Sequence, residues 1–209
     1  ARISRTVTIL ILWSWVIASV AIAQSKTTEV NLSFSTWNAV YSSALGLPVY
    51  IAWDVTRDDI GSVKREPSMP FRADPRLGPD AVCSDDYNRS GYHRGHMVPA
   101  ADRSSSLAAM QETFVMTNVC PQLPSLNTGA WKRLENYERV AALRLGRVHI
   151  RVAPIFTHED TSRIACGKVA VPHGYIKVIY AADSLTVIAC QLFTNQHDRE
   201  KKSPGNKEQ

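Results

Sequence analysis

The chain has 209 residues, of which 44% are hydrophobic and 21% charged, and it carries a formal net charge of +5 at pH 7. These proportions exclude a wholly disordered chain, a collagen-like repeat and a membrane protein with several spans. The length suits one domain with short appendages, and the mildly basic charge is compatible with a polyanionic partner without requiring one.

Residues 1–23 have the pattern of an export signal. Arg2 and Arg5 form a short basic region, and an uncharged, mostly apolar run from Thr6 to Ala23 ends on small residues. This pattern predicts a cleaved signal and therefore a periplasmic or secreted protein. An uncleaved N-terminal membrane anchor is the alternative, because the run reaches the lower limit of length for spanning a bilayer.

The segment that follows alternates between irregular and regular patterns. Residues 24–46 are rich in Ser and Thr without sustained periodicity, which predicts a linker or a loosely packed arm. The apolar, β-branched and aromatic residues 47–55 predict a strand. Prolines and charges make residues 57–89 irregular in our prediction. A short helix over 104–113 and a second strand over 114–119 are expected next.

The clearest predicted element is a helix from Thr128 to Leu145. Its apolar stripe recurs at helical spacing and consists of Ala130, Leu134, Tyr137, Ala141 and Leu145. Asn127 is expected to cap the start of this helix, and Gly146 is expected to end it.

Strands dominate the remaining part of the chain. Residues 147–155 alternate between apolar side chains and polar ones such as His149 and Arg151, which predicts a half-buried strand. Further strands are expected over 169–171, 175–180 and 186–193.

The order of these elements predicts an α+β fold with a mainly antiparallel sheet. We expect a single domain over residues 47–196, followed by a disordered polar tail over 197–209.

Export would place four cysteines in an oxidising compartment, and they are Cys83, Cys120, Cys166 and Cys190. They allow up to two disulfides, whose pairing the sequence leaves open. The pair Cys166–Cys190 is the easier one to form, since it flanks two consecutive predicted strands. A zinc site made of the first two cysteines with His93 and His96 is the alternative, although closely spaced cysteine pairs are lacking.

Chemically informative residues gather first in the segment from Gly91 to Asp102. Gly95 separates Arg94 from His96, and a glycine there lets the backbone approach a ligand closely with a guanidinium and an imidazole beside it. A basic loop with incidental histidines is the alternative interpretation of this segment alone.

A second group lies on the predicted helix and consists of Asn127, Trp131, Glu135 and Arg139. Each step of four residues advances about 40° around a helix, so the group forms one stripe beside the apolar one. An amide oxygen, a carboxylate and a guanidinium in a row are the groups that a hydrated metal ion and a phosphate require together.

The two groups together resemble the DNA/RNA non-specific endonuclease family, which includes secreted bacterial nucleases and mitochondrial endonuclease G. The family signature reads Asp-Arg-Gly-His, then (Ser/Thr)-Asn-x-x-Pro-Gln, then Leu-Asn-x-x-x-Trp-x-x-Leu-Glu. The corresponding segments here are residues 93–96, 117–122 and 126–135, within a resemblance that covers residues 48–196. His93 replaces the family's usual acid, and the chain ends where many relatives continue with another helix.

The resemblance implies a ββα-metal nuclease module set on the sheet, which hydrolyses DNA and RNA to products with 5′-phosphates. His96 would be the general base that deprotonates the attacking water. Asn127 would be the single direct protein ligand of Mg²⁺, for which Mn²⁺ would substitute, and Glu135 would bind the metal through water. No small-molecule cofactor beyond the metal is expected, and a homodimer is compatible with the family.

The remaining roles are also those that the resemblance implies. Arg94 and Arg139 would neutralise charge on the scissile phosphate and the leaving group, and Arg65 would add a weaker phosphate contact. Asn118 would brace the site, and Trp131 is expected in the core rather than stacked on a base. None of these groups reads a base edge, so weak sequence specificity is expected.

Two other classes of function stay open at this point. One is a nucleic-acid-binding protein that kept the fold but lost catalysis through the change to His93. The other is a structural domain with zinc bound by the cysteines and histidines.

Overall fold

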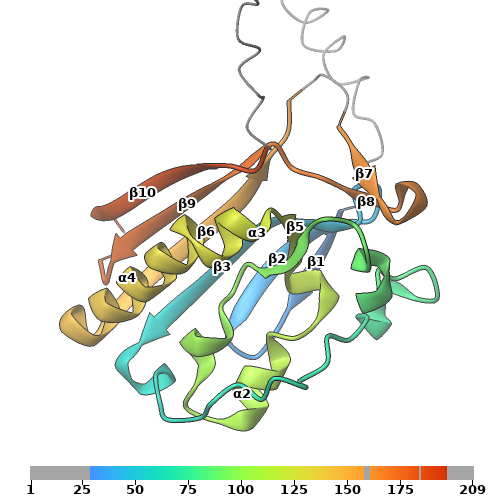
Figure 1. Cartoon of the computed structure of the whole chain (residues 1–209). Coiled ribbons are helices and arrows are strands. Elements are labelled where there is room, and N and C mark those ends of the chain that lie inside the picture. The colour runs from blue at the N-terminus through green and yellow to red at the C-terminus, as the bar shows by residue number, and fades with distance from the viewer. Residues whose placement is uncertain (1–28, 158–160, 184, 197–209) are drawn as a thin grey trace, which may run out of the picture.

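A six-stranded antiparallel sheet of order β1-β2-β3-β6-β9-β10 is the main feature of the computed structural model, which describes residues 29–157, 161–183 and 185–196 (Figure 1). Its strands are β1 (Glu29–Ser33), β2 (Trp37–Ser42), β3 (Leu47–Thr56), β6 (Arg147–Ile155), β9 (Gly174–Ala181) and β10 (Val187–Thr194). The predicted export signal and the predicted C-terminal tail lie outside the described residues. Within the described part of the chain, no helix has the length and apolarity needed to cross a membrane.

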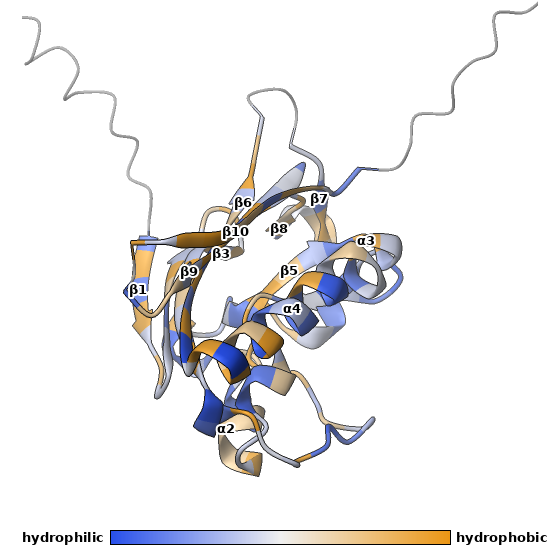
Figure 2. Ribbon diagram, turned by 90° about the vertical axis from the view of Figure 1, so that its left-hand side faces the viewer, coloured by the Kyte–Doolittle hydropathy of each residue, from blue (hydrophilic) through white to orange (hydrophobic). Residues whose placement is uncertain are grey.

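The helices cover one face of this sheet (Figures 1 and 2). They are α2 (Leu107–Glu112), α3 (Pro124–Thr128) and α4 (Ala130–Leu145). The predicted alternation along β6 is confirmed, because Val148, Ile150 and Val152 are buried beneath the helices while the residues between them are not. Full burial of each such side chain contributes about 1.5–3 kcal/mol, so this face is where the core forms.

Two smaller strand pairs complete the fold. β4 (His93–His96) pairs antiparallel with β5 (Val119–Gln122), and β7 (Arg163–Ile164) pairs with β8 (Val169–Ala170). β5 leads directly into α3 and α4, so that two strands and a helix form a ββα unit against the main sheet. The predicted α+β class with a mainly antiparallel sheet is therefore confirmed.

The expected linker over residues 24–46 is corrected by the structure, which has β1 and β2 in most of this segment. Trp37, Ala39 and Tyr41 are all buried and alternate along β2 with more exposed residues. The Trp37 ring stacks on the ring of Phe34 with 3.5 Å between the centroids. This alternation of buried and exposed residues is short and lies among Ser and Thr residues, so the composition of the segment did not indicate a strand.

The predicted helix over 128–145 is divided in two at Gly129. A Cβ atom at Gly129 would lie 2.4 Å from the carbonyl oxygen of Ser125, so the close turn between α3 and α4 requires glycine. Asn127 accordingly lies within α3 and does not cap α4. Gly146 does end α4, with a φ of 85°.

The apolar stripe of α4 is also shifted from the predicted one. Tyr137 and Leu145 are 45% and 52% exposed. The buried side chains are Trp131, Leu134, Glu138, Ala141 and Ala142. Trp131 therefore belongs to the core as predicted, where its ring contacts Tyr175 and Phe193.

The segments on either side of β4 differ from the prediction mainly in their boundaries. The region over 57–89 contains only short 3-10 turns, as its prolines indicated. α2 is shorter than the predicted helix and is capped at its start by Ser106, whose hydroxyl accepts a hydrogen bond from the Ala109 amide. The strand expected over 114–119 begins only at Val119, after a 3-10 turn over Met116–Asn118.

All four cysteines are free thiols, so the expected disulfides are not formed. Cys120 is buried in β5, whereas Cys166 and Cys190 are exposed on separate elements. Across the described ranges, no three His, Cys, Asp or Glu side chains lie close enough together to hold a metal ion. The alternative zinc site is therefore not formed either.

A buried ion pair joins α4 to β9 inside the core. Lys177 Nζ lies 3.1 Å and 2.8 Å from the two carboxylate oxygens of Glu138, and both side chains are completely buried. The same Nζ lies 4.9 Å from the ring centroids of Trp53 and Trp131. The charge of Lys177 therefore neutralises that of Glu138, which offsets the free-energy cost of burying both groups.

We predict that Lys177→Met destabilises the protein by about 3–5 kcal/mol, because it leaves the Glu138 carboxylate buried without a partner. The double variant Lys177→Met/Glu138→Leu should regain most of this loss, since neither charge remains. Urea unfolding of the three proteins measures both effects. A double variant no more stable than Lys177→Met would contradict this account of the pair.

Candidate active site

A cleft of about 1000 Å³ lies where β4, α3 and α4 meet the loop that precedes Phe71. It brings together most of the predicted site residues, and its lining includes Arg65, His93, Arg94, His96, Asn127, Glu135 and Arg139. Lys64 and Lys132 line the same cleft although neither belongs to a recognisable motif; in the sequence, their charge was the only signal. Segments far apart in the sequence therefore build one basic cavity.

β4 supplies three of these side chains from only four residues. Its register with β5 pairs His93 with Gln122 and His96 with Val119. Gly95 lies over the side chain of Gln122, where a Cβ atom would be 2.2 Å from Oε1. A glycine at this position therefore lets β4 pack against β5, and the close approach of a ligand to its backbone stays a prediction.

Asn118 lies behind the cleft rather than in it. The buried amide accepts a hydrogen bond from the Val98 amide at 2.9 Å and donates to the carbonyl oxygens of Val98 and Thr113 at 3.0 Å and 2.9 Å. These bonds fix the chain that leaves β4 against the turn that precedes β5. Asn118 thus joins these two segments by three hydrogen bonds, and its role in bracing the site for catalysis stays a prediction.

The His96 imidazole is enclosed by aromatic rings. The Phe71 and Phe114 centroids lie 4.9 Å and 4.7 Å from it, and Nε2 is buried without a hydrogen-bond partner among the described residues. Burial, aided by the charge of Arg65, lowers the pKa of His96 to about 3. The ring is therefore neutral near pH 7 and has the protonation state of a general base.

Arg65 lies at the rim of the same aromatic group. Its guanidinium carbon is 4.9 Å from the centroid of Phe114, and its side chain is exposed. This position brings a positive charge to the cleft on the side where His96 lies.

The Asn127 side chain projects into the cleft from α3. Its Nδ2 lies 3.1 Å from Nδ1 of His93, and no donor within the described ranges bonds its Oδ1. Glu135 lines the same cleft from α4, and burial raises the pKa of its carboxyl to about 7. An amide oxygen with a nearby carboxyl suits a hard cation that keeps most of its water, and such a cation would favour the ionised form of Glu135.

Arg94 is held by the turn over Ser84–Tyr87. Its Nε and Nη2 donate to the Ser84 carbonyl at 3.0 Å and 2.6 Å, and Nη2 also donates to Asn88 Oδ1 at 2.6 Å. Arg94 thus lines the cleft with the orientation of its guanidinium already fixed.

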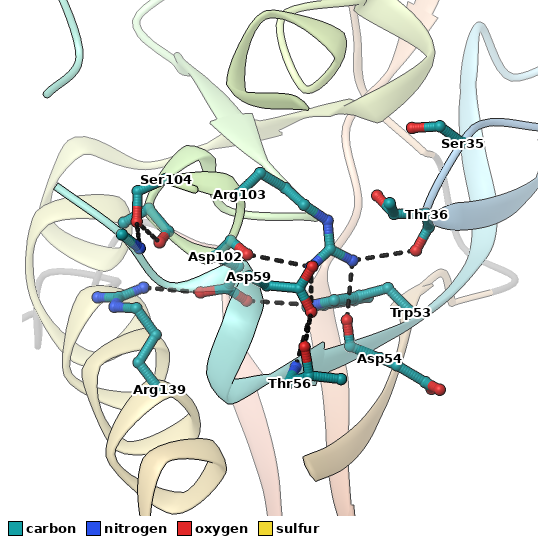
Figure 3. A network of polar contacts seen from close by, with 12 residues as sticks. Ser35, Thr36, Trp53, Asp54, Thr56, Asp59, Asp102, Arg103, Ser104 and Arg139 are labelled. Atoms are coloured by element: carbon teal, nitrogen blue, oxygen red, sulfur yellow. Dashed lines mark hydrogen bonds and ion pairs between the residues drawn. The ribbon is translucent and has the colours of Figure 1, made fainter. Parts of the chain in front are cut away.

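Arg139 is held by a carboxylate that sequence reasoning missed (Figure 3). Nη1 of Arg139 donates to Asp102 Oδ1 at 2.9 Å, and Asp102 Oδ2 accepts from Trp53 Nε1 at 3.1 Å. Asp102 is completely buried, so both oxygens need these partners. In the sequence, the only indication of this role was the position of Asp102 at the end of the segment Gly91–Asp102, directly after small, apolar residues.

A second buried residue fastens the Asp102 turn to the sheet. Arg103 donates to the carbonyl oxygens of Thr36 and Asp54 at 3.0 Å and 2.8 Å, beside the end of β3 (Figure 3). The turn that carries Asp102 is thus tied to β3 and to the loop between β1 and β2.

The profile of the DNA/RNA non-specific endonuclease family matches residues 17–204. The chain belongs to this family. The resemblance that the sequence motifs indicated is thereby confirmed, and the match extends over nearly the whole chain. The ββα unit described above is the part of the fold that carries those motifs.

Named relatives are nucleases from bacteria and from mitochondria. The chain is 32% identical over 146 residues to a nuclease of Nostoc sp., covering 69% of this chain and 52% of that protein. It is 34% identical over 150 residues to the mitochondrial nuclease EXOG of Xenopus laevis, covering 66% and 42%. It is 38% identical over 103 residues to human mitochondrial endonuclease G, covering 45% and 35%. The chain thus matches about half or less of the length of these relatives.

A solved structure shares the fold. A chain of the crystal structure of the EndoG/EndoGI complex superposes with a TM-score of 0.71 at 26% identity, covering 79% of this chain and 74% of that chain. The ββα-metal fold expected from the sequence is therefore confirmed.

We predict that His96 stays neutral in the folded protein from pH ~8 to ~5, whereas an unfolded histidine titrates near 6.5. NMR titration of the imidazole signals measures this, with the His96→Gln variant assigning the signal and the urea-unfolded protein as control. A midpoint near 6.5 for His96 in the folded protein would show that its aromatic surroundings do not disfavour the charged ring.

Proposed function

We propose that this protein is a metal-dependent endonuclease that hydrolyses phosphodiester bonds of DNA and RNA without sequence preference and leaves 5′-phosphates. The observation that carries the proposal is the neutral His96 imidazole in the same cleft as the Asn127 amide and the Glu135 carboxyl. Membership of the endonuclease family supports it. The names of the relatives, all nucleases among those compared above, agree with it.

The protein groups divide the chemistry between them. His96 would accept the proton of the attacking water, since its Nε2 is unpartnered and its pKa is too low for the ring to be charged. Asn127 would hold the metal through Oδ1, and Glu135 would accept hydrogen bonds from the waters of its hydration shell. Mg²⁺ is the proposed ion, with Mn²⁺ as a substitute; when bound, it stabilises the charge that develops on the phosphate and the leaving oxygen.

The arginines would complete the charge balance. Arg139 is oriented by Asp102 and Arg94 by Ser84, so both guanidinium groups are fixed before a substrate arrives. Preoriented cations stabilise a developing negative charge without reorganisation during the reaction. Arg65 and the cleft-lining lysines Lys64 and Lys132 would bind flanking phosphates.

Specificity and location are also part of the proposal, and each rests on different residues. Phosphate contacts position a nucleic acid without reading its bases, which favours both DNA and RNA as substrates. Export, or anchoring by residues 1–23, is proposed from the basic and apolar pattern of that segment alone. A homodimer stays a prediction.

The test is incubation of the purified protein with supercoiled plasmid and, separately, with RNA. We predict nicking and then fragmentation of both substrates with Mg²⁺, complete loss of cleavage with EDTA, and recovery when Mg²⁺ is added back. Raising the salt should weaken cleavage, because phosphate contacts release counterions. Binding of both nucleic acids without cleavage at any salt would instead favour the non-catalytic alternative.

A further inference from the structure

His93 occupies the position at which this chain departs from its family, and the structure shows what it contacts. The residue begins β4, is exposed at the cleft, and its Nδ1 lies 3.1 Å from Nδ2 of Asn127. The two side chains come from different elements, since Asn127 lies in α3. A residue that replaces a carboxylate thus contacts the proposed metal ligand directly.

The chemistry of the two groups fixes the direction of this hydrogen bond. A side-chain NH₂ group only donates, so Nδ1 of His93 must accept with its lone pair, and the ring proton is on Nε2. With Nδ2 engaged, the carbonyl oxygen of the Asn127 amide is turned away from His93. An amide that lacked this partner would present nitrogen or oxygen to the cleft with similar ease, because the two have nearly the same shape.

The backbones of both residues are fixed, so the hydrogen bond can act on the amide alone. Asn127 donates its main-chain N–H to the Leu123 carbonyl at 2.9 Å, within the turn that forms α3. His93 is held in register against Gln122 of β5. The torsions of the two side chains are the freedom that remains.

We propose that His93 is a positioning residue that orients the Asn127 amide, so that Oδ1 and not Nδ2 faces the metal. This inference rests on the proposed function, in which Asn127 holds the metal. The acceptor for the Asn127 amide is the Nδ1 lone pair of the His93 imidazole. The change to His93 therefore preserves the metal site and does not abolish it.

The direct test is to measure, by calorimetry, the binding of Mn²⁺ to the purified protein in the absence of nucleic acid. His93→Ala removes the acceptor and should weaken Mn²⁺ binding by about 10- to 100-fold, the range found when partners of metal ligands are removed. His93→Asp supplies a carboxylate acceptor and should therefore retain the Mn²⁺ affinity of the parent. His173→Ala, a histidine outside the cleft lining, is the matched control and should bind like the parent.

Two outcomes would overturn the proposal. Unchanged Mn²⁺ binding by His93→Ala would show that the amide needs no orienting partner. Binding by His93→Asp as weak as that of His93→Ala would show that the imidazole acts in another way, such as ligating the metal itself.

A spectroscopic measurement on the parent protein keeps the proposal testable even if His93→Ala does not fold. At slightly alkaline pH, the ¹⁵N shifts of His93 should identify the tautomer with its proton on Nε2, and a protonated Nδ1 would overturn the proposal. Plasmid cleavage is scored separately. A parent protein that binds Mn²⁺ in the expected way but leaves nucleic acid intact would refute the proposed function and not the positioning role.

Discussion

The pairing of β4 with β5 is the constraint on which the whole cleft depends. Four residues of β4 carry His93, Arg94 and His96, and a strand this short has little stability of its own. β5 is therefore anchored to the main sheet from outside the pair. The Pro121 carbonyl accepts hydrogen bonds from Tyr175 Oη at 2.6 Å and from Asn195 Nδ2 at 2.9 Å. Both donors are buried, and they tie the nuclease motif to β9 and to the segment after β10.

Burial of polar groups beneath α4 explains why the site is held rigidly. Asp102 pairs with Arg139 and Glu138 pairs with Lys177, and each of the two carboxylates is completely buried. Burying a charge is unfavourable unless it is paired and hydrogen-bonded, so these pairs tolerate few alternative arrangements. Arg139 extends from this network to the cleft, whereas His96 is half-buried among aromatic rings and has no ionic partner among the described residues. Opposite environments thus produce a fixed cation and a neutral base in one cavity.

Sequence patterns correctly predicted those features that depend on the spacing of residues close together in the chain. The alternation in residues 147–155 gave β6 with both ends correct, and the spacing of Asn127, Glu135 and Arg139 brought all three to one cleft. The division at Gly129 was missed because it depends on a close approach to Ser125 that periodicity does not register. The role of Asp102 was missed for a similar reason, since its partners Trp53 and Arg139 are distant in the sequence. The cysteines misled because their number suggested bonds that the fold does not bring together.

The central claim is that a half-buried, neutral His96 is the base for phosphodiester hydrolysis, and single-turnover cleavage by His96→Ala tests it most directly. With DNA, Mg²⁺ and excess protein, we predict a rate constant about 10²- to 10⁴-fold below that of the parent, the usual cost of removing a general base. DNA affinity, measured with EDTA present, should be unchanged, because phosphate contacts come from the arginines and lysines. His149→Ala, whose ring pairs with Asp54 outside the cleft, controls for the loss of a histidine. Cleavage by His96→Ala at the parental rate would contradict the account.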